Sequence, residues 1–178
     1  KLGEVPIKQM EAMLQNLLRK LKESPKDAEL RKKRTEIAAK LTAFRIREWQ
    51  RRCKELPNDT KLRFELGSWF YEGKKYDEAI ACFQKTVNDT RLSQETHLWL
   101  GRCFRAKGQH DHAIREFEKS RGSAGSMDKK NMEVTYELGC LWEDKGDAAK
   151  AKEEFEKIYE VDIEFKDVSR RLEKLSEE

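Results

Sequence analysis

The sequence predicts an all-α protein built from stacked pairs of helices, and three observations support this fold class. The first is a repeated spacing: a Leu-Gly pair recurs at intervals of 34 and then 38 residues, with its glycine at Gly67, Gly101 and Gly139. The second is composition, because 40% of the residues are charged, 37% are hydrophobic and only three are proline. Helical pairs with a large solvent-exposed surface fit that composition better than a single large hydrophobic core does. The third is a glycine near the middle of each copy, at Gly73, Gly108 and Gly146, where a short helix-helix connection needs conformational freedom.

Each copy is predicted to form two amphipathic helices. In residues 60–91 the apolar side chains recur every three to four residues, first at Leu62, Leu66, Trp69 and Phe70 and then at Ala79, Ile80, Phe83 and Val87. The three copies together predict helices at about 60–72, 77–89, 93–107, 111–121, 131–145 and 148–160. The four residues inserted between the second and third copies fall in 122–126, which is predicted to be a loop because it has no apolar periodicity.

The pattern resembles the tetratricopeptide repeat (TPR) family, whose unit has this 34-residue helix-turn-helix length and this spacing of Leu-Gly, Phe, Ala and Phe. The copies depart from the family at its early tryptophan, where Arg63, His97 and Thr135 stand. The resemblance implies a TPR-type right-handed α-solenoid over residues 59–178, with repeats at 60–93, 94–127 and 132–162. Glycine in the first helix and alanine in the second are expected where the two helices cross, because a larger side chain would hold them apart.

A capping helix is predicted at 164–176, because one apolar stripe runs through Phe165, Val168, Leu172 and Leu175. A solenoid exposes the hydrophobic seam of its last repeat unless a further helix covers it. The segment IYEVDIEFKDVSRRLEKL is similar to the one that closes a group of bacterial TPR proteins. This second resemblance implies a bacterial type of TPR protein.

Residues 1–58 are predicted to form an N-terminal helical hairpin. One apolar stripe is predicted to contain Ile7, Met10, Met13, Leu14, Leu17, Leu18 and Leu21. The segment 24–27 is predicted to end that helix and cap the next. Residues 28–56 contain no glycine or proline and favour one long helix whose stripe changes sides, so that its first half packs on the preceding helix and its second half on the first repeat. The alternative is a break near Thr42 and Ala43, which would make this segment a degenerate helical pair.

The two parts of the chain differ in charge. Residues 1–58 hold sixteen Lys and Arg against eight Asp and Glu, whereas the net charge of the whole chain is +4. The basic residues form a strip that could bind nucleic acid or another polyanion, with Glu29, Glu36, Glu48 and Glu55 diluting it. The strip comprises Arg31, Lys32, Lys33, Arg34, Arg45, Arg47, Arg51, Arg52 and Lys54. A run of charge is more often a solvated helix face, so polyanion binding is the alternative function and not the leading one.

No motif for catalysis, a cofactor or a metal stands out. The sequence lacks a phosphate-binding loop, an H-E-x-x-H pair and a C-x-x-C pair. His110 and His112 are two apart and would diverge on a helix, and Ser123 and Ser126 lack the G-x-S-x-G arrangement. Carboxylates such as those of Glu153, Glu154 and Glu156 alternate with lysines and are predicted to be weak exposed ion pairs. We therefore expect no cofactor and no enzymatic activity.

The leading functional prediction is a protein-protein interaction scaffold that binds a peptide or helix in a concave groove. In the TPR family the first helix of each pair lines that groove, and the resemblance places these groove residues on this chain: Phe64, Ser68, Tyr71, Leu98, Arg102, Arg105, Tyr136, Cys140 and Glu143. Arg102 and Arg105 are expected to grip an acidic group of the partner, and reversal of their charge to weaken its capture without lowering the melting temperature. One TPR subgroup clamps the C-terminal carboxylate of chaperones with lysines and asparagines. Phe64, Ser68, Cys140 and Glu143 do not fit that set, so no such clamp is predicted.

The four cysteines, Cys53, Cys82, Cys103 and Cys140, are widely spaced and are predicted to be small apolar groups within the helices. A helical protein of this size has little need of disulfides, which favours a reducing compartment and hence the cytoplasm. No apolar run is long enough to span a membrane. The chain begins in mid-pattern at Lys1 without a methionine, so it could be a piece of a longer protein. Partner identity and oligomeric state have no signal in the sequence.

Overall fold

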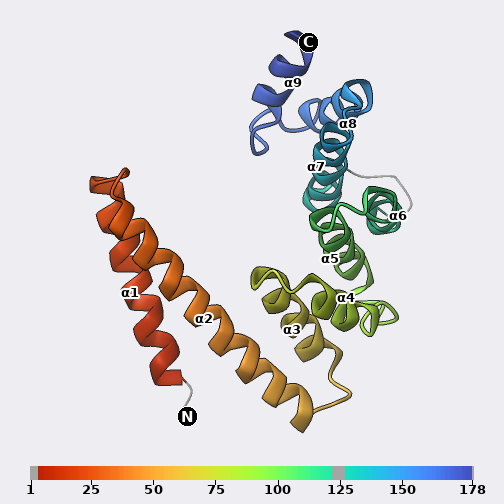
Figure 1. Ribbon diagram of the computed structural model, residues 1–178. Helices are drawn as coiled ribbons and strands as arrows, with labels where there is room; N and C mark the ends of the chain where they lie inside the picture. The colour runs from red at the N-terminus through yellow and green to blue at the C-terminus, as the bar shows by residue number, and fades with distance from the viewer. Residues whose placement is uncertain (1–3, 122–126, 178) are drawn as a thin grey trace. The chain divides into compact units, whose positions relative to one another are not determined.

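The computed structural model describes residues 4–121 and 127–177, and within these ranges it holds nine helices and no strand (Figure 1). The predicted loop at 122–126, with Ser123 and Ser126, lies outside the described residues. The chain divides into two compact units, residues 1–79 and residues 80–178. Each unit is described by itself below. The all-α class predicted from the sequence is confirmed.

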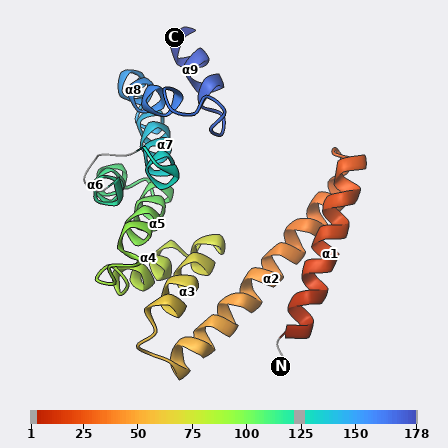
Figure 2. The same ribbon diagram turned by 180° about the vertical axis from the view of Figure 1, so that it is seen from behind.

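The first unit contains helices α1 (Glu4–Glu23), α2 (Ala28–Glu55) and α3 (Thr60–Glu72). Helix α2 packs against both α1 and α3, and it is one continuous helix, as predicted (Figure 2). The carboxylate of Asp27 caps α2 by accepting a hydrogen bond from the backbone N–H of Leu30 at 3.0 Å. Asp59 caps α3 in the same way through Leu62 N–H, also at 3.0 Å. These aspartates satisfy backbone donors that the first turn of a helix leaves without partners, and so they mark where each helix begins.

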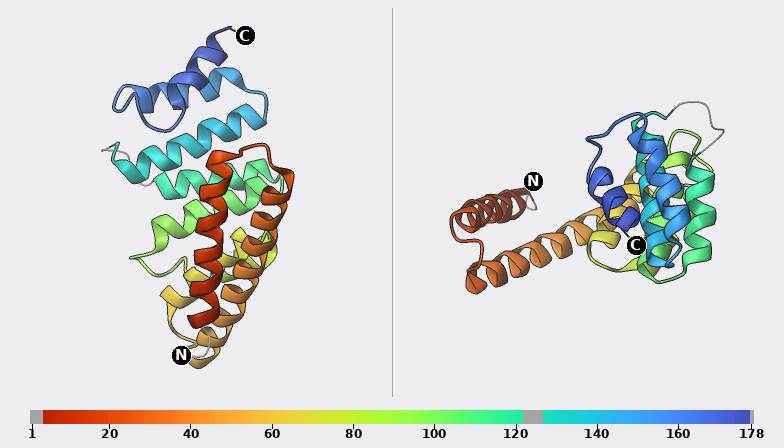
Figure 3. Two further views of the ribbon diagram at one scale, coloured as in Figure 1. Left: turned by 90° about the vertical axis from the view of Figure 1, so that its left-hand side faces the viewer. Right: turned by 90° about the horizontal axis from the view of Figure 1, so that it is seen from above.

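Helix α4 (Tyr76–Gln84) contains the division between the units, and the second unit continues with α5 (Ser93–Ala106), α6 (His110–Arg121), α7 (Lys129–Asp144), α8 (Ala148–Tyr159) and α9 (Val168–Glu177). Within this unit each of α5 to α8 packs on the helix that follows it. Figure 3 draws these green to blue helices from two further sides. Helix α4 ends five residues earlier than predicted. The buried hydroxyl of Thr86 bonds the Phe83 carbonyl oxygen at 2.9 Å and the Thr96 hydroxyl at 3.1 Å, which supports a turn in place of further helix.

The repeated small residues lie where two helices touch. Ala113 and Ala151 are fully buried, and so are Phe117 and Phe155 four residues later. A Cβ atom added to Gly139 would lie 2.6 Å from Cε1 of Phe155, and one added to Gly101 would overlap the ring of Phe117. The prediction that close helix crossing requires these glycines is confirmed.

The turn inside the first repeat differs from the prediction. Gly73 was expected to supply conformational freedom there, but its φ is −78° and the left-handed residue is Lys74, with φ 57°. In the other two repeats the left-handed residue is a glycine, Gly108 at φ 71° and Gly146 at φ 76°. Because Lys74 precedes Gly108 by 34 residues, the repeat register assigns the turn position correctly and the nearest glycine does not. A side chain at this φ is strained, so the first repeat carries a local defect.

Two apolar clusters hold the second unit together. One cluster joins α5, α6 and α7 through Leu98, Ala113, Phe117, Val134, Leu138 and Leu141. The other joins α7, α8 and α9 and contains the fully buried Val168, against which Phe165, Leu172 and Leu175 pack. The predicted stripe of the C-terminal helix therefore covers the end of the last repeat, beginning as a helix at Val168 and not at 164.

Candidate protein-binding surface

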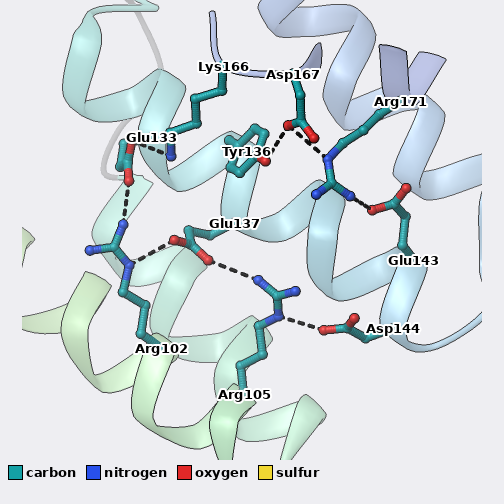
Figure 4. Close-up of polar contacts among 10 residues, drawn as sticks. All are labelled: Arg102, Arg105, Glu133, Tyr136, Glu137, Glu143, Asp144, Lys166, Asp167 and Arg171. Carbon is teal, nitrogen blue, oxygen red and sulfur yellow. Dashed lines mark hydrogen bonds and ion pairs between the residues drawn. The ribbon is translucent and has the colours of Figure 1, made fainter. Parts of the chain in front are cut away.

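An ion-pair network lies between the first helices of the second and third repeats. Arg102 on α5 donates from Nε to Glu137 at 2.8 Å and also bonds Glu133, both on α7. Arg105, one turn along α5, donates to the other oxygen of Glu137 at 3.1 Å and to Asp144 at 2.6 Å. The acidic residues are spaced along one face of α7, and the arginines of α5 lie beside them (Figure 4). Because the arginines recur at helical spacing on α5 and the acidic residues recur at helical spacing on α7, the two rows of side chains can form ion pairs.

The network continues from α7 to the segment that leads into α9. Lys166 pairs with the second oxygen of Glu133 at 2.7 Å, and Arg171 bonds both Glu143 and Asp167. The Tyr136 hydroxyl donates to Asp167 at 2.5 Å, and Lys166 Nζ lies 4.1 Å from the centre of the Tyr136 ring. We call the ten residues drawn in Figure 4 the charged face: Arg102, Arg105, Glu133, Tyr136, Glu137, Glu143, Asp144, Lys166, Asp167 and Arg171.

The pairs hold the charged face in its ionised form. Burial raises the pKa of Glu133 and of Asp167, but their bonds to Lys166 and Arg102, and to Tyr136 and Arg171, more than offset this and leave both pKa values below the ordinary ones. Burial and the bond to Asp167 raise the pKa of Tyr136 well above its usual range, so its hydroxyl remains a donor. At neutral pH the Glu133 and Asp167 carboxyls are therefore ionised, and the Tyr136 hydroxyl keeps its proton.

The residues that the sequence predicts to line the groove differ in exposure. Phe64, Leu98 and Cys140 are buried, and Ser68, Tyr71, Arg102, Arg105, Tyr136 and Glu143 are partly exposed. Six of them belong to the second unit, where Leu98 and Cys140 are buried and four are part of the charged face: Arg102, Arg105, Tyr136 and Glu143. Phe64, Ser68 and Tyr71 belong to α3 in the first unit. Burial raises the pKa of the Cys140 thiol, which makes it an apolar contact and not a nucleophile.

The structure revises the role expected of the two arginines. Both were predicted to await an acidic group of a partner, but Glu133, Glu137 and Asp144 already occupy them. Residues of α7 therefore already balance the charge of both arginines before any partner binds. The expectation that charge reversal leaves the melting temperature unchanged is revised with it, because the reversed side chains would meet these acids.

Sequence reasoning missed Glu137, Lys166, Asp167 and Arg171. A signal for Glu137 was present, since Glu133 and Glu137 are four residues apart on the first helix of one repeat and the two arginines are three apart on that of the preceding repeat. Asp167 and Arg171 lie in the capping segment, outside the repeat register. No linear spacing connects them to α7.

The carboxylates of α8 also differ in exposure. Glu153 and Glu156 are exposed, as predicted, but Glu154 is only 8% exposed. It pairs with Arg121 of α6 and with Lys157 at 3.0 Å. Glu154 therefore links two helices across a buried contact, because α6 brings a guanidinium to it that the local sequence does not contain.

Much of the basic strip in the first unit is already neutralised. Arg45 pairs with Glu11 of α1, Arg51 with Glu48 and Glu55, and Arg52 with Glu48. Of the acids expected only to dilute the strip, Glu48 and Glu55 thus pair with Arg51 and Arg52. This leaves the polyanion-binding alternative with fewer available charges than the sequence suggested.

In 4–121 and 127–177, no group of three or more His, Cys, Asp or Glu side chains is arranged to hold a metal ion. Burial raises the pKa of the Cys103 thiol to about 12, as for an apolar core residue. Among the helices within those ranges, none is both long and apolar enough to cross a bilayer.

Comparison with known proteins identifies the repeat. Residues 62–89 match the model of the tetratricopeptide repeat. A Guillardia theta protein named uncharacterized protein ycf37 is 27% identical over 145 residues, which cover 78% of this chain and 79% of that protein.

Solved structures share the fold. MamA superposes with a TM-score of 0.66 at 22% identity, covering 82% of this chain and 81% of its own. A thermophilic TPR protein of Thermus thermophilus superposes with a TM-score of 0.64 at 16% identity, covering 97% of this chain and 98% of its own. The type III secretion translocator chaperone SycD of Yersinia enterocolitica superposes with a TM-score of 0.55 at 25% identity, covering 65% of this chain and 82% of its own. Residues 62–89 thus match the tetratricopeptide repeat in sequence, and the chain has the all-helical fold of TPR solenoid structures.

Proposed function

We propose that this protein is a non-catalytic interaction scaffold that binds a peptide or helix of a protein partner along the first helices of its repeats. The observation that carries the proposal is the charged face of the second unit, where side chains of α5 and α7 come together on a support of fully buried Phe117 and Phe155. A rigid support beneath partly exposed Arg, Glu and Tyr side chains is the arrangement from which binding hot spots are made. SycD, which is named a translocator chaperone, supports a protein as the partner.

The pairing within the charged face restricts the partner. Each of Arg102, Arg105 and Arg171 is bound to two carboxylates, so a partner that offers only negative charge gains little by displacing them. A segment with hydrogen-bonding groups of both kinds and one apolar side chain for Tyr136 fits better. This agrees with the predicted absence of a clamp for the acidic tail of chaperones.

The test is capture of a partner by the full chain, followed by titration of that partner against two matched variants. Arg105→Ala removes a charge from the face, and Arg115→Ala removes the same charge from α6, where Arg115 is exposed and contacts His112. We expect Arg105→Ala to weaken binding about tenfold, which is about 1.4 kcal/mol, and Arg115→Ala to change it less than about twofold. Equal affinities of the two variants, both well folded, would place the binding site elsewhere.

A further inference from the structure

A groove lies in the first unit, whereas the charged face belongs to the second. It has a volume of about 820 Å³ and is lined by the second half of α1, the middle of α2 and the turn after α3. In Figure 1 the lining elements are the red α1, the orange α2 and the end of α3. Ligand sites of this kind typically span about 300–1,000 Å³, so the groove is large enough for several side chains of a partner.

Small and apolar side chains form the floor of the groove. Ala38, Ala39, Thr42 and Ala43 lie on one side of α2, and Ile46 follows one turn later. From α1, Leu14 and Leu18 complete the apolar lining, with Leu18 37% exposed. Alanines at these positions keep the α2 backbone accessible to a bulky group from outside.

The groove exists because α2 has two neighbours that do not cover this side of its middle. The first half of α2 turns Leu41 toward the core, where it is 6% exposed. In the second half, Trp49 of α2 meets Trp69 of α3, with ring centres 6.3 Å apart. The switch of apolar stripe along α2, visible in the sequence, leaves Ala39 and Ala43 on a side that neither helix occupies, and both are exposed.

The rim of the groove is basic. Arg34 and Arg47 stand at its two edges on α2, Lys74 and Lys75 come from the turn, and Glu72 is its one acidic lining residue. Among residues 4–121 and 127–177, none of these four cations forms an ion pair, unlike Arg45, Arg51 and Arg52 of the same unit. Positive charge around an apolar floor selects a partner that brings negative charge around an apolar centre.

We propose that this groove binds one amphipathic helix of a partner protein, with an apolar stripe on the floor and acidic residues against the basic rim. A helix presents anchors at i, i+3, i+4 and i+7, and a stripe of this kind suits a long groove beside α2. The inference rests on the proposed function only in making the partner a protein. It assigns a different surface, partner charge and set of residues.

Two other occupants fit less well. A second copy of the chain would offer α1, but the last turn of α1 carries Lys20 and Lys22, which repel a basic rim. An anionic bilayer would attract the basic rim. The flat surface of a bilayer does not reach the alanine side chains of the floor, which lie between α1 and the turn after α3. Charge and concavity together favour an acidic helix.

The test uses two synthetic helical peptides of about 18 residues, long enough for a marginal helix. Both carry the same leucine stripe, flanked by glutamates in one and by lysines in the other, and each is labelled for fluorescence anisotropy with the full chain. We expect the glutamate peptide to bind at least about tenfold more tightly than the lysine peptide, with an affinity that falls as salt rises.

Three variants locate the binding. Ala43→Glu places a carboxylate on the floor, and Arg34→Glu with Arg47→Glu reverses the charge at both edges. Each of these variants is expected to weaken binding of the glutamate peptide about tenfold or more. Lys33→Glu with Lys40→Glu makes the same charge change on the same helix, at residues that line a different hollow. This control should retain at least about half of the wild-type affinity. All the substituted residues are exposed, so the fold should be kept.

Four results would overturn the inference. These are no binding of the glutamate peptide at about 100 μM, equal binding of both peptides, wild-type affinity in Ala43→Glu, or equal losses in the edge variant and its control. Binding to phosphatidylserine vesicles without peptide binding would assign the groove to membranes. Self-association that Ala43→Glu abolishes, again without peptide binding, would assign it to a second copy. Because Arg105→Ala tests the charged face, either proposal can fail while the other stands.

Discussion

The two units use similar helices in different ways. In the first unit, the long helix α2 buries only Leu41 and Ile46. In the second unit the shorter α7 buries six residues, and Phe117 and Phe155 have no exposed surface. Helix length therefore does not decide how much a helix contributes to a core. The number of faces covered by neighbours does, and α7 is covered on several sides whereas the middle of α2 is open.

The sharpest test of this difference compares truncations in the two units. Phe117→Ala should destabilise the second unit by about 3–5 kcal/mol, because it removes a fully buried ring and leaves a cavity. Leu14→Ala in the half-exposed hairpin should cost only about 1 kcal/mol. Urea unfolding followed by hydrogen exchange in each unit measures both. Similar losses would mean that the hairpin is as tightly packed as the repeats.

Charge reversal on the charged face should have the next largest effect. Arg102→Glu with Arg105→Glu would place two new carboxylates against Glu137 and should lower the stability of the second unit by about 2–3 kcal/mol. Arg115→Glu on the exposed side of α6 is the matched control and should change it by less than about 0.5 kcal/mol. An unchanged melting temperature in the double variant would show that these pairs do not stabilise the fold.

Acid should weaken the second unit in a smaller and graded way. The folded-state pKa values of Glu133 and Asp167 lie below the ordinary values of 4.5 and 3.8. The stability that these groups contribute is thus fully present above those ordinary values and is lost as the pH falls through the lower folded values. Urea midpoints from pH 6 to pH 3 should fall more steeply for the wild type than for Glu133→Gln. Parallel curves would remove Glu133 as a source of the pH dependence.

The smallest expected effect is a gain. Lys74→Gly should stabilise the first unit by about 0.5–1 kcal/mol, because glycine adopts the left-handed conformation of this turn without a Cβ clash. Gly108→Lys in the equivalent turn of the second repeat should cost a similar amount. Thermal melts of both variants measure the two changes. A loss in Lys74→Gly would show that the lysine side chain has a stabilising contact stronger than its backbone strain.

Local features of the fold could be predicted from the sequence because they depend on neighbours along the chain. The 3.6-residue period indicates the helices, and Asp27 and Asp59 mark where two of them begin. The repeated pattern of small and aromatic residues predicts the close contact between Gly101 and Phe117. The left-handed turn residue of the first repeat was wrongly predicted to be Gly73, although Lys74 lies 34 residues before Gly108. Each of these features involves residues of one helix or of one helical pair.

The partners of the charged side chains were decided by the tertiary structure. Arg105 lies 39 residues before Asp144, and Arg121 lies 33 residues before Glu154. Such pairs depend on how far each helical pair is rotated and shifted relative to the next, which the spacing within one helix does not specify. The open side of α2 has the same origin, since the sequence shows that its apolar stripe changes sides, and only the packing of α1 and α3 shows which side stays uncovered.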